Sequence, residues 1–135
     1  MNKLMALDIG TKRIGVALSD FLQVIATGNC VIERLPEKNA VEQIKKIAIE
    51  NKVQKIVIGV PLNMDGTKGN QAQDCIDFSK KFDDEFEIIY EDERLTSEQA
   101  EENLRNKKID FRKNKGLIDI ESACIILEQY MSRIK

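Results

Sequence analysis

Acidic side chains occur at three points of the sequence where strands and helices could bring them together. Asp8 ends the first apolar run, the acids Glu91–Glu93 follow the run FEIIY at residues 86–90, and Asp119 precedes a long apolar segment. The carboxyl ends of strands in an α/β sheet are where ligands bind. Clustered carboxylates there would supply oxygen ligands for Mg²⁺ or Mn²⁺.

Each acid also has an ordinary structural interpretation. Asp8 could hydrogen-bond the backbone of a turn, Glu91–Glu93 could form a solvated strand end, and Asp119 could be the N-cap of the last helix. Side chains alternate along a strand, so Glu91 and Glu93 are expected on one side and Asp92 on the other.

The sequence contains no histidine, which excludes Ser-His-Asp, Cys-His and histidine general-base chemistry. The three cysteines, Cys30, Cys75 and Cys124, are far apart and include no C-x-x-C pair. This pattern argues against structural zinc and against a disulfide framework. Reduced, buried thiols in a chain without a secretory signal or an apolar stretch of membrane-spanning length predict a cytoplasmic protein that does not contact a membrane.

The net charge of −2 and the pI of about 5.3 count against a broadly basic nucleic-acid surface. Basic residues are nevertheless concentrated between Arg105 and Lys115, with Asp110 as the single acid. This segment predicts a local phosphate-binding arm, with a solvated loop as the alternative. Its candidate substrate contacts are Lys107, Lys108, Arg112, Lys113 and Lys115.

Other candidate substrate-binding residues follow predicted strands. Lys12 and Arg13 come just after the first strand, where an arginine beside a metal site would suit a phosphate. Arg94 follows the acidic strand end and could contact substrate or pair with a nearby acid. Asn63 and Thr67 lie in a polar loop after the fourth strand, for which a plain turn is the alternative.

The elements that would position these residues are visible in the hydrophobic pattern. Apolar runs at 3–9, 14–18 and 24–32 predict three successive strands, an antiparallel meander. Later segments predict a helix at 37–50, a strand at 53–60, a helix at 71–82, a strand at 86–90, a helix at 96–107 and a last helix from Asp119. The order β-β-β-α-β-α-β-α-α predicts an α/β fold with a five-stranded mixed sheet and helices on both faces.

This order is that of RNase H-like proteins, and also of one half of an actin-like ATPase. At 135 residues with 42% hydrophobic and 33% charged residues, the chain is expected to form one domain over residues 1–135. Actin-like ATPases hold their nucleotide between two such domains, so the ATPase interpretation is disfavoured.

Four sequence blocks resemble the YqgF (RuvX) family of pre-16S rRNA nucleases and Holliday junction resolvase-like proteins. They are residues 8–20 (DIGTKRIGVALSD), 58–67 (IGVPLNMDGT), 92–97 (DERLTS) and 119–130. The blocks occur in the family's order and span nearly the whole chain. One departure is Ser122, where the family usually carries alanine.

The resemblance implies an RNase H-like fold in which Asp8, Glu93 and Asp119 cluster as catalytic, metal-binding carboxylates. Two Mg²⁺ or Mn²⁺ ions roughly 4 Å apart could then activate water and stabilise the leaving oxygen of a phosphodiester. The implied task is maturation of the 5′ end of pre-16S rRNA. Resolution of branched DNA and a non-catalytic nucleic-acid adaptor are the alternatives, and the protein is expected to be a monomer or a homodimer.

Overall fold

The computed structural model describes residues 2–63, 65–93, 96–110, 114 and 116–134. Its strands are β1 (Lys3–Ile9), β2 (Arg13–Ser19), β3 (Ala26–Glu33), β4 (Val53–Val60) and β5 (Glu87–Asp92). Its helices are α1 (Glu37–Glu50), α2 (Asn70–Ser79), α3 (Thr96–Asn106) and α4 (Gly116–Arg133). The predicted order of elements is confirmed.

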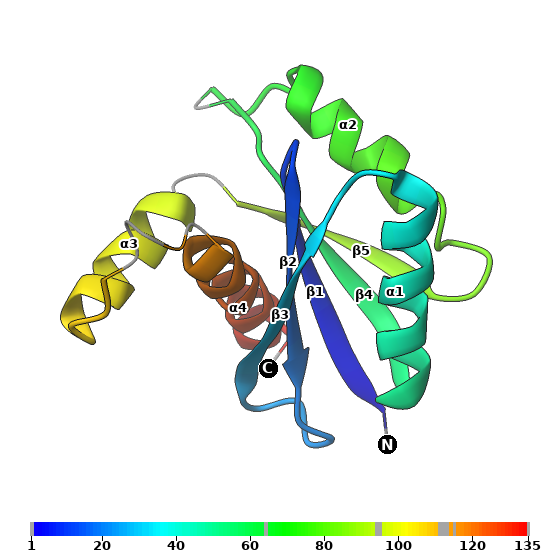
Figure 1. Cartoon of the computed structure of the whole chain (residues 1–135), viewed down its shortest axis with the longest axis horizontal. Helices are drawn as coiled ribbons and strands as arrows, with labels where there is room; N and C mark the ends of the chain where they lie inside the picture. Colours follow the sequence, from blue (N-terminus) through cyan, green and yellow to red (C-terminus); the bar gives the residue numbers. More distant parts are fainter. Residues whose placement is uncertain (1, 64, 94–95, 111–113, 115, 135) are drawn as a thin grey trace.

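The five strands form one mixed sheet in the order β3-β2-β1-β4-β5. β1 pairs antiparallel with β2 and parallel with β4, β3 adds antiparallel to β2, and β5 adds parallel to β4. Helices α1 and α2 cover one face and α4 crosses the other, while α3 extends beside α4 (Figure 1). The prediction of helices on both faces is therefore confirmed, and β1 is the central strand.

Alternate residues of β1 divide between two apolar cores, as the period of a strand requires. Met5 and Leu7 pack with the buried faces of α1 and α2. Leu4 and Ala6 pack with the buried residues of α4. Asp8 continues the series of Leu4 and Ala6, so it lies on the α4 face at the carboxyl end of the strand.

Several predicted boundaries shift by a few residues; β5, for example, ends at Asp92 and not at residue 90. Three other differences have identifiable causes, two of them simple. The third strand begins at Ala26 because the Asp20 carboxylate accepts the backbone N–H groups of Val24 and Ile25 at 2.8 and 3.0 Å, which holds them in a turn. The second helix ends at Ser79, and the buried Phe82 lies in the turns that follow it.

The third difference concerns the last helix, which begins three residues before the predicted Asp119. The backbone N–H of Gly116 donates to the side-chain oxygen of Asn114 at 3.0 Å, and Leu117 donates to the Asn114 carbonyl at 3.2 Å. Asp119 is therefore a residue of the first helical turn, and the N-cap interpretation is wrong.

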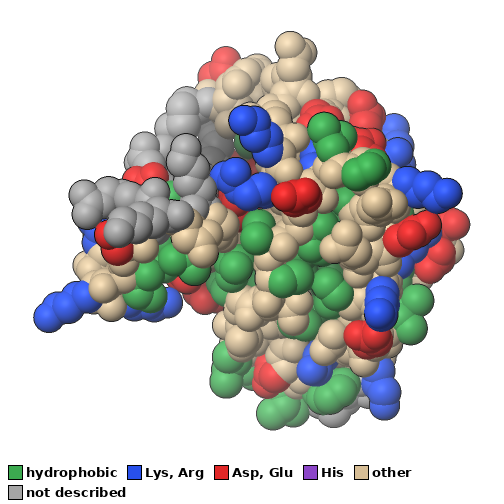
Figure 2. All heavy atoms as spheres, in the orientation of Figure 1, with side chains coloured by type: hydrophobic (Ala, Val, Ile, Leu, Met, Phe, Trp, Pro, Cys, Tyr) green, Lys and Arg blue, Asp and Glu red, His purple; other side chains and the backbone are tan. Residues whose placement is uncertain are grey.

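The connection between β2 and β3 carries apolar side chains at the end of the sheet opposite Asp8. Phe21, Leu22, Val24 and Ile25 are all exposed, and Figure 2 shows apolar side chains at this end of the molecule. No helix in the described part of the chain has both the length and the apolar character needed to cross a membrane.

Candidate active site

Asp8 lies in a row of the sheet where both neighbouring strands carry glycine. Gly15 is its partner on β2, and Gly59 on β4 follows the pair formed by Leu7 and Ile58. A Cβ atom on Gly15 would overlap the backbone carbonyl of Asp119, and one on Gly59 would lie 2.6 Å from the Glu93 carboxylate. The two glycines thus allow a helix backbone and an acidic side chain to approach the strand that carries Asp8.

Glu93 follows the last residue of β5 and extends the sheet by one bond, because its N–H donates to the carbonyl of Val60 at 3.2 Å. Its carboxyl group forms a side-chain hydrogen bond with Asp8. Burial, the Asp8 charge and this hydrogen bond raise the pKa of Glu93 to about 9. Glu93 is therefore largely protonated near neutral pH and can donate to the ionised Asp8.

Asp8 is the more acidic member of this pair. Its pKa is raised to about 6: burial raises it most, the hydrogen bond with Glu93 lowers it, and the negative charge of Asp119 raises it. Two half-buried carboxyl groups that share a proton, with Asp119 beside them, form a site of negative potential. Such a site attracts a divalent cation, which would compete with the proton.

The negative charge of Asp119 acts on Asp8, but the Asp119 carboxylate forms its hydrogen bond with Arg13. Its Oδ2 atom accepts a hydrogen bond from Nε of Arg13 at 2.7 Å, in an ion pair that is partly exposed. Among the described residues, no three acidic or cysteine side chains are gathered into a ready-made metal site. The structure thus brings Asp8 and Glu93 into contact. Asp119 lies beside them, with its carboxylate bonded to Arg13.

The neighbouring acids Glu91 and Asp92 point away from this pair. Glu91 shares the α4 face with Glu93, as predicted from alternation, but its carboxylate accepts bonds from Arg133 at 2.6 and 3.2 Å. Asp92 alternates to the other side and is exposed. Glu93 is therefore the β5 acid that faces Asp8.

The donor set fits a hard divalent cation. Asp8 and Glu93 offer only oxygen atoms, which suits Mg²⁺ or Mn²⁺. A second sign of fit is the buried hydroxyl of Ser122 on α4, which has no hydrogen-bond partner within the described part of the chain. Asp119 could join these ligands if its bond to Arg13 were exchanged.

The predicted substrate-binding residues occupy different surroundings. Lys12 is exposed in the turn between β1 and β2, and Lys107 lies 3.5 Å from Glu121. Lys108 is exposed and has a φ of 59° just after α3. The remaining predicted contacts, Arg94, Arg112, Lys113 and Lys115, lie outside the described residues.

Asn63 and Thr67 bond to each other within the loop that follows β4. The Asn63 amide donates to the Thr67 hydroxyl at 3.0 Å, and the Thr67 hydroxyl donates to Asp65 at 2.7 Å. Gly66 adopts the left-handed φ of 87° that this tight turn requires. The contacts are those expected of a turn, which was the alternative interpretation for both residues.

Sequence reasoning missed a buried arginine on the opposite face. The Arg34 side chain is 7% exposed and bonds to Asp74 of α2 through two nitrogens at 2.6 and 2.7 Å. It also donates to the Gly10 carbonyl and to Glu37, each at 3.1 Å. Arg34 thereby fixes the turn that carries Lys12. No local sequence pattern marks this contact, because Arg34 and Asp74 are forty residues apart.

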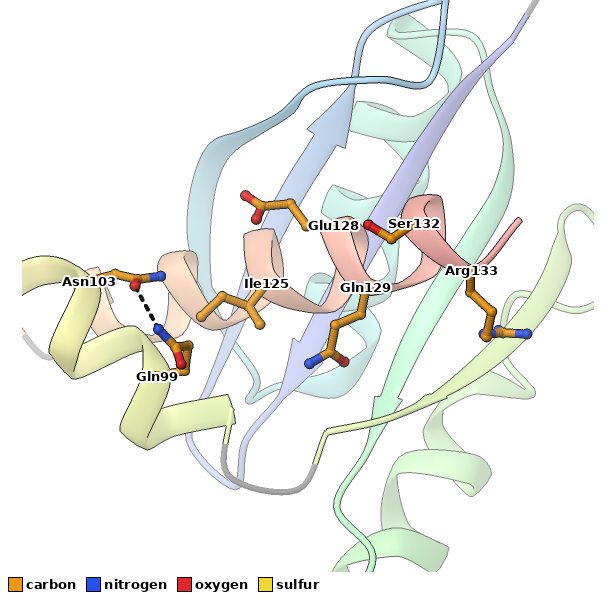
Figure 3. Close-up of a pocket in the computed structure, with 7 residues that line it drawn as sticks. All are labelled: Gln99, Asn103, Ile125, Glu128, Gln129, Ser132 and Arg133. Carbon is orange, nitrogen blue, oxygen red and sulfur yellow. Dashed lines mark hydrogen bonds between the residues drawn. The ribbon is translucent and has the colours of Figure 1, made fainter. Parts of the chain in front are cut away.

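A polar groove of about 650 Å³ separates α3 from the later turns of α4 (Figure 3). The Gln99 and Asn103 amides hydrogen-bond each other at 2.9 Å along its α3 side. Its lining residues are Gln99, Asn103, Ile125, Glu128, Gln129, Ser132 and Arg133. The groove offers mostly uncharged hydrogen-bonding groups, so it is a poor match for the phosphate backbone.

The fold resembles those of solved resolvases. The fowlpox virus resolvase, solved with substrate Holliday junction DNA, covers 98% of this chain and of its own at a TM-score of 0.61 and 16% identity. T. thermophilus RuvC, solved with a Holliday junction substrate, covers 99% of this chain and 96% of its own at a TM-score of 0.56 and 11% identity. The fold and the acid pair at its sheet edge define an RNase H-like protein.

The sequence defines the family more narrowly. The model of the RuvX family, described as Holliday junction resolvase, matches residues 2–133. Relatives from Crocosphaera subtropica and Clostridioides difficile are 45% and 39% identical over 131 residues, covering 96% of this chain and 92% and 93% of their own. Both are named "Putative pre-16S rRNA nuclease". The chain belongs to the RuvX family, whose members bear the names of hydrolases acting on phosphodiester bonds.

Proposed function

We propose that this protein is a metal-dependent endonuclease that cuts structured RNA in the cytoplasm, with the 5′ end of pre-16S rRNA as its substrate. The observation that carries the proposal is the half-buried, hydrogen-bonded pair Asp8–Glu93 at the carboxyl edge of the sheet, with Asp119 beside it. The names of the relatives supply the substrate.

The acids would act through one or two divalent cations, Mg²⁺ or Mn²⁺. A cation held there supplies positive charge that activates a water molecule and stabilises the oxygen leaving phosphorus. Asp8 is fixed in the central strand and provides the least mobile ligand. Glu93 would have to release its proton to solvent to hold the cation, because a metal ligand must be ionised.

Arg13 would link substrate binding to the third acid. A guanidinium group has five N–H donors, and the bond to Asp119 uses one of them. A substrate phosphate could replace Asp119 as the hydrogen-bond acceptor of the guanidinium, since phosphate and carboxylate are both anionic oxygen acceptors. Asp119 would then turn toward Asp8 and Glu93 and complete the acid cluster.

Lysine and arginine side chains around this edge would bind the phosphate backbone without reading sequence. Lys12 is the exposed cation next to Arg13. The arm after α3 would extend the contact through Lys107, Lys108, Arg112, Lys113 and Lys115, and Arg94 would contact substrate beside Glu93. Asn63 and Thr67 would contribute only if their mutual bonds opened.

Cleavage of branched DNA is the second candidate function, favoured by the description of the matching family model. In the deciding experiment, purified protein is incubated with a 5′-extended 16S rRNA precursor or a four-way DNA junction, each with Mg²⁺, Mn²⁺ or EDTA, and cleavage is measured. Metal-dependent cutting of the precursor alone supports the proposal. Cutting of the junction alone would show instead that the protein is a resolvase of branched DNA.

The matched variants are Glu93→Gln and Asp92→Asn, neighbouring acids on opposite faces of the sheet. Glu93→Gln should abolish cutting, whereas Asp92→Asn should retain it. A wild-type protein that binds precursor without cutting it under any metal condition would be an adaptor, and the nuclease proposal would be withdrawn.

A further inference from the structure

Ser122 has an unusual environment in the second turn of α4. Its side chain is fully buried, and its hydroxyl is the one buried side-chain oxygen or nitrogen of the described residues without a hydrogen-bond partner. A buried hydroxyl without a partner costs free energy, so native structures contain few of them.

The turns on either side of Ser122 contact the sheet next to the acid pair. Three residues earlier, the carbonyl of Asp119 occupies the space where a side chain on Gly15 would lie. Four residues later, the Cδ1 atom of Ile126 occupies the corresponding space at Gly59. Ser122 is therefore in the turn that passes between the two glycines flanking the first acid.

The Glu93 carboxylate lies against the same part of the sheet as this region of α4. A side chain built on Gly59 would meet both Ile126 and the Glu93 carboxylate, so these two groups lie against the same point of β4. Ile126 and Ser122 are one helical turn apart on α4. The Glu93 carboxyl group is engaged with Asp8, which leaves the Ser122 hydroxyl without an acceptor.

We propose that Ser122 is a positioning residue whose hydroxyl donates to the Glu93 carboxylate when a divalent cation is bound. A cation ligated by both acids replaces their mutual hydrogen bond, which frees an oxygen of Glu93 as an acceptor. The new bond would fix the carboxylate in its ligating orientation, as polar groups behind metal ligands do. This inference rests on the proposed metal-dependent function.

The test compares Mn²⁺ binding to the wild-type protein and to Ser122→Ala by isothermal titration calorimetry without nucleic acid. A hydrogen bond to a charged group predicts about 10-fold weaker Mn²⁺ binding in the variant. In EDTA the same variant should melt at an equal or higher temperature, because it loses a buried hydroxyl without a partner. Equal or tighter Mn²⁺ binding by folded Ser122→Ala overturns the proposal.

Ser79→Ala is the matched control, since Ser79 is also a fully buried serine but lies on the other side of the sheet. Its hydroxyl bonds to the Ile76 carbonyl at 2.6 Å and to the Tyr90 hydroxyl at 2.8 Å. This variant should melt lower in EDTA and bind Mn²⁺ as the wild type does. Failure of the wild-type protein to bind Mn²⁺ would overturn both this inference and the metal-dependent function, whereas a Ser122→Ala variant that binds normally overturns only the role of Ser122.

Discussion

The two faces of the sheet bury charged side chains in opposite ways. On the α1 and α2 face, Arg34 and Asp74 form a pair of opposite charge, in which the hydrogen bond from Arg34 lowers the pKa of Asp74. On the α4 face, Asp8 and Glu93 form a pair of like groups, in which burial raises the pKa of both. The first pair stabilises the fold, whereas the second destabilises it when ionised.

The difference indicates that the proposed site lowers the stability of the fold, whereas the Arg34 pair raises it. The Arg34 pair can be satisfied by the protein alone, because each charge has its partner in the chain. The Asp8 pair is satisfied at neutral pH only by retaining a proton or by acquiring a cation. Breaking each pair should therefore have opposite consequences for stability and activity.

Asp8→Asn should have the largest effect of all, on activity. We expect a loss of at least roughly 1,000-fold in the rate of metal-dependent cleavage, since Asp8 is the central ligand of the proposed site. The rate of precursor cleavage under single-turnover conditions measures it. At pH 8 the metal-free variant should unfold at a higher urea concentration than wild type, and a lower midpoint would contradict the idea that the acid pair is strained.

Arg34→Ala should have the largest effect on stability. Arg34 is buried but Asp74 is partly exposed, so removing Arg34 should cost about 2 kcal/mol of unfolding free energy, less than for a fully buried pair. Urea denaturation followed by circular dichroism measures the loss. Activity per folded molecule should fall much less than in Asp8→Asn, and a variant as stable as wild type would remove Arg34 from its structural role.

Arg13→Gln tests the other arginine–aspartate pair, whose arginine is more exposed than Arg34. A partly exposed ion pair contributes about 1 kcal/mol or less, so stability should barely change. The Michaelis constant for nucleic acid should rise about 10-fold through the lost phosphate contact. Unchanged substrate binding would mean that Arg13 serves only to hold Asp119.

The free energy of unfolding of the metal-free protein should depend on pH through the titration of Asp8 and Glu93. The pKa of Asp8 is raised from 3.8 to about 6 and that of Glu93 from 4.5 to about 9. Between the unfolded and folded pKa values, the metal-free folded protein binds more protons than the unfolded chain. The two acids therefore contribute fully to the free energy of unfolding below about pH 4, and this contribution is lost as the pH rises toward 9. Urea midpoints should thus contain a component that falls between pH 5 and 9.

The double variant Asp8→Asn, Glu93→Gln provides the control for this trend. Neither replacement titrates, so the falling component should be absent from its urea midpoints. Adding Mn²⁺ to the wild-type protein should raise its midpoint more at pH 8 than at pH 6, because protons compete with the cation at lower pH. A wild-type profile parallel to that of the double variant would contradict the raised pKa values.

Local sequence signals predicted most of the fold because they coincide with local structure. Period-two and helical apolar patterns located every strand and helix, and alternation placed Glu91 and Glu93 on one side. The start of α4 was missed because Asn114, five residues before Asp119, interacts with the first turn. That bond depends on how the preceding loop is folded, which the apolar pattern does not encode.

The contacts of the site were less predictable than its members. Sequence resemblance selected Asp8, Glu93 and Asp119, but no spacing rule indicates that Asp119 bonds to Arg13. The buried Arg34 was missed for the same reason, since its partners come from three separate segments. Long-range polar contacts are set by tertiary geometry, whereas apolar periodicity is set by the nearest neighbours in sequence.

Helix α3 makes its main contacts with α4 and extends beyond the sheet (Figure 1). Regions with few buried contacts open more readily than the core, and their amide hydrogens exchange sooner. Glu93 lies at the entrance to this helix, whereas Asp8 lies in the most protected strand. We therefore expect α3 to open on heating before the sheet melts, while the backbone bond from Glu93 to Val60 keeps Glu93 on the sheet.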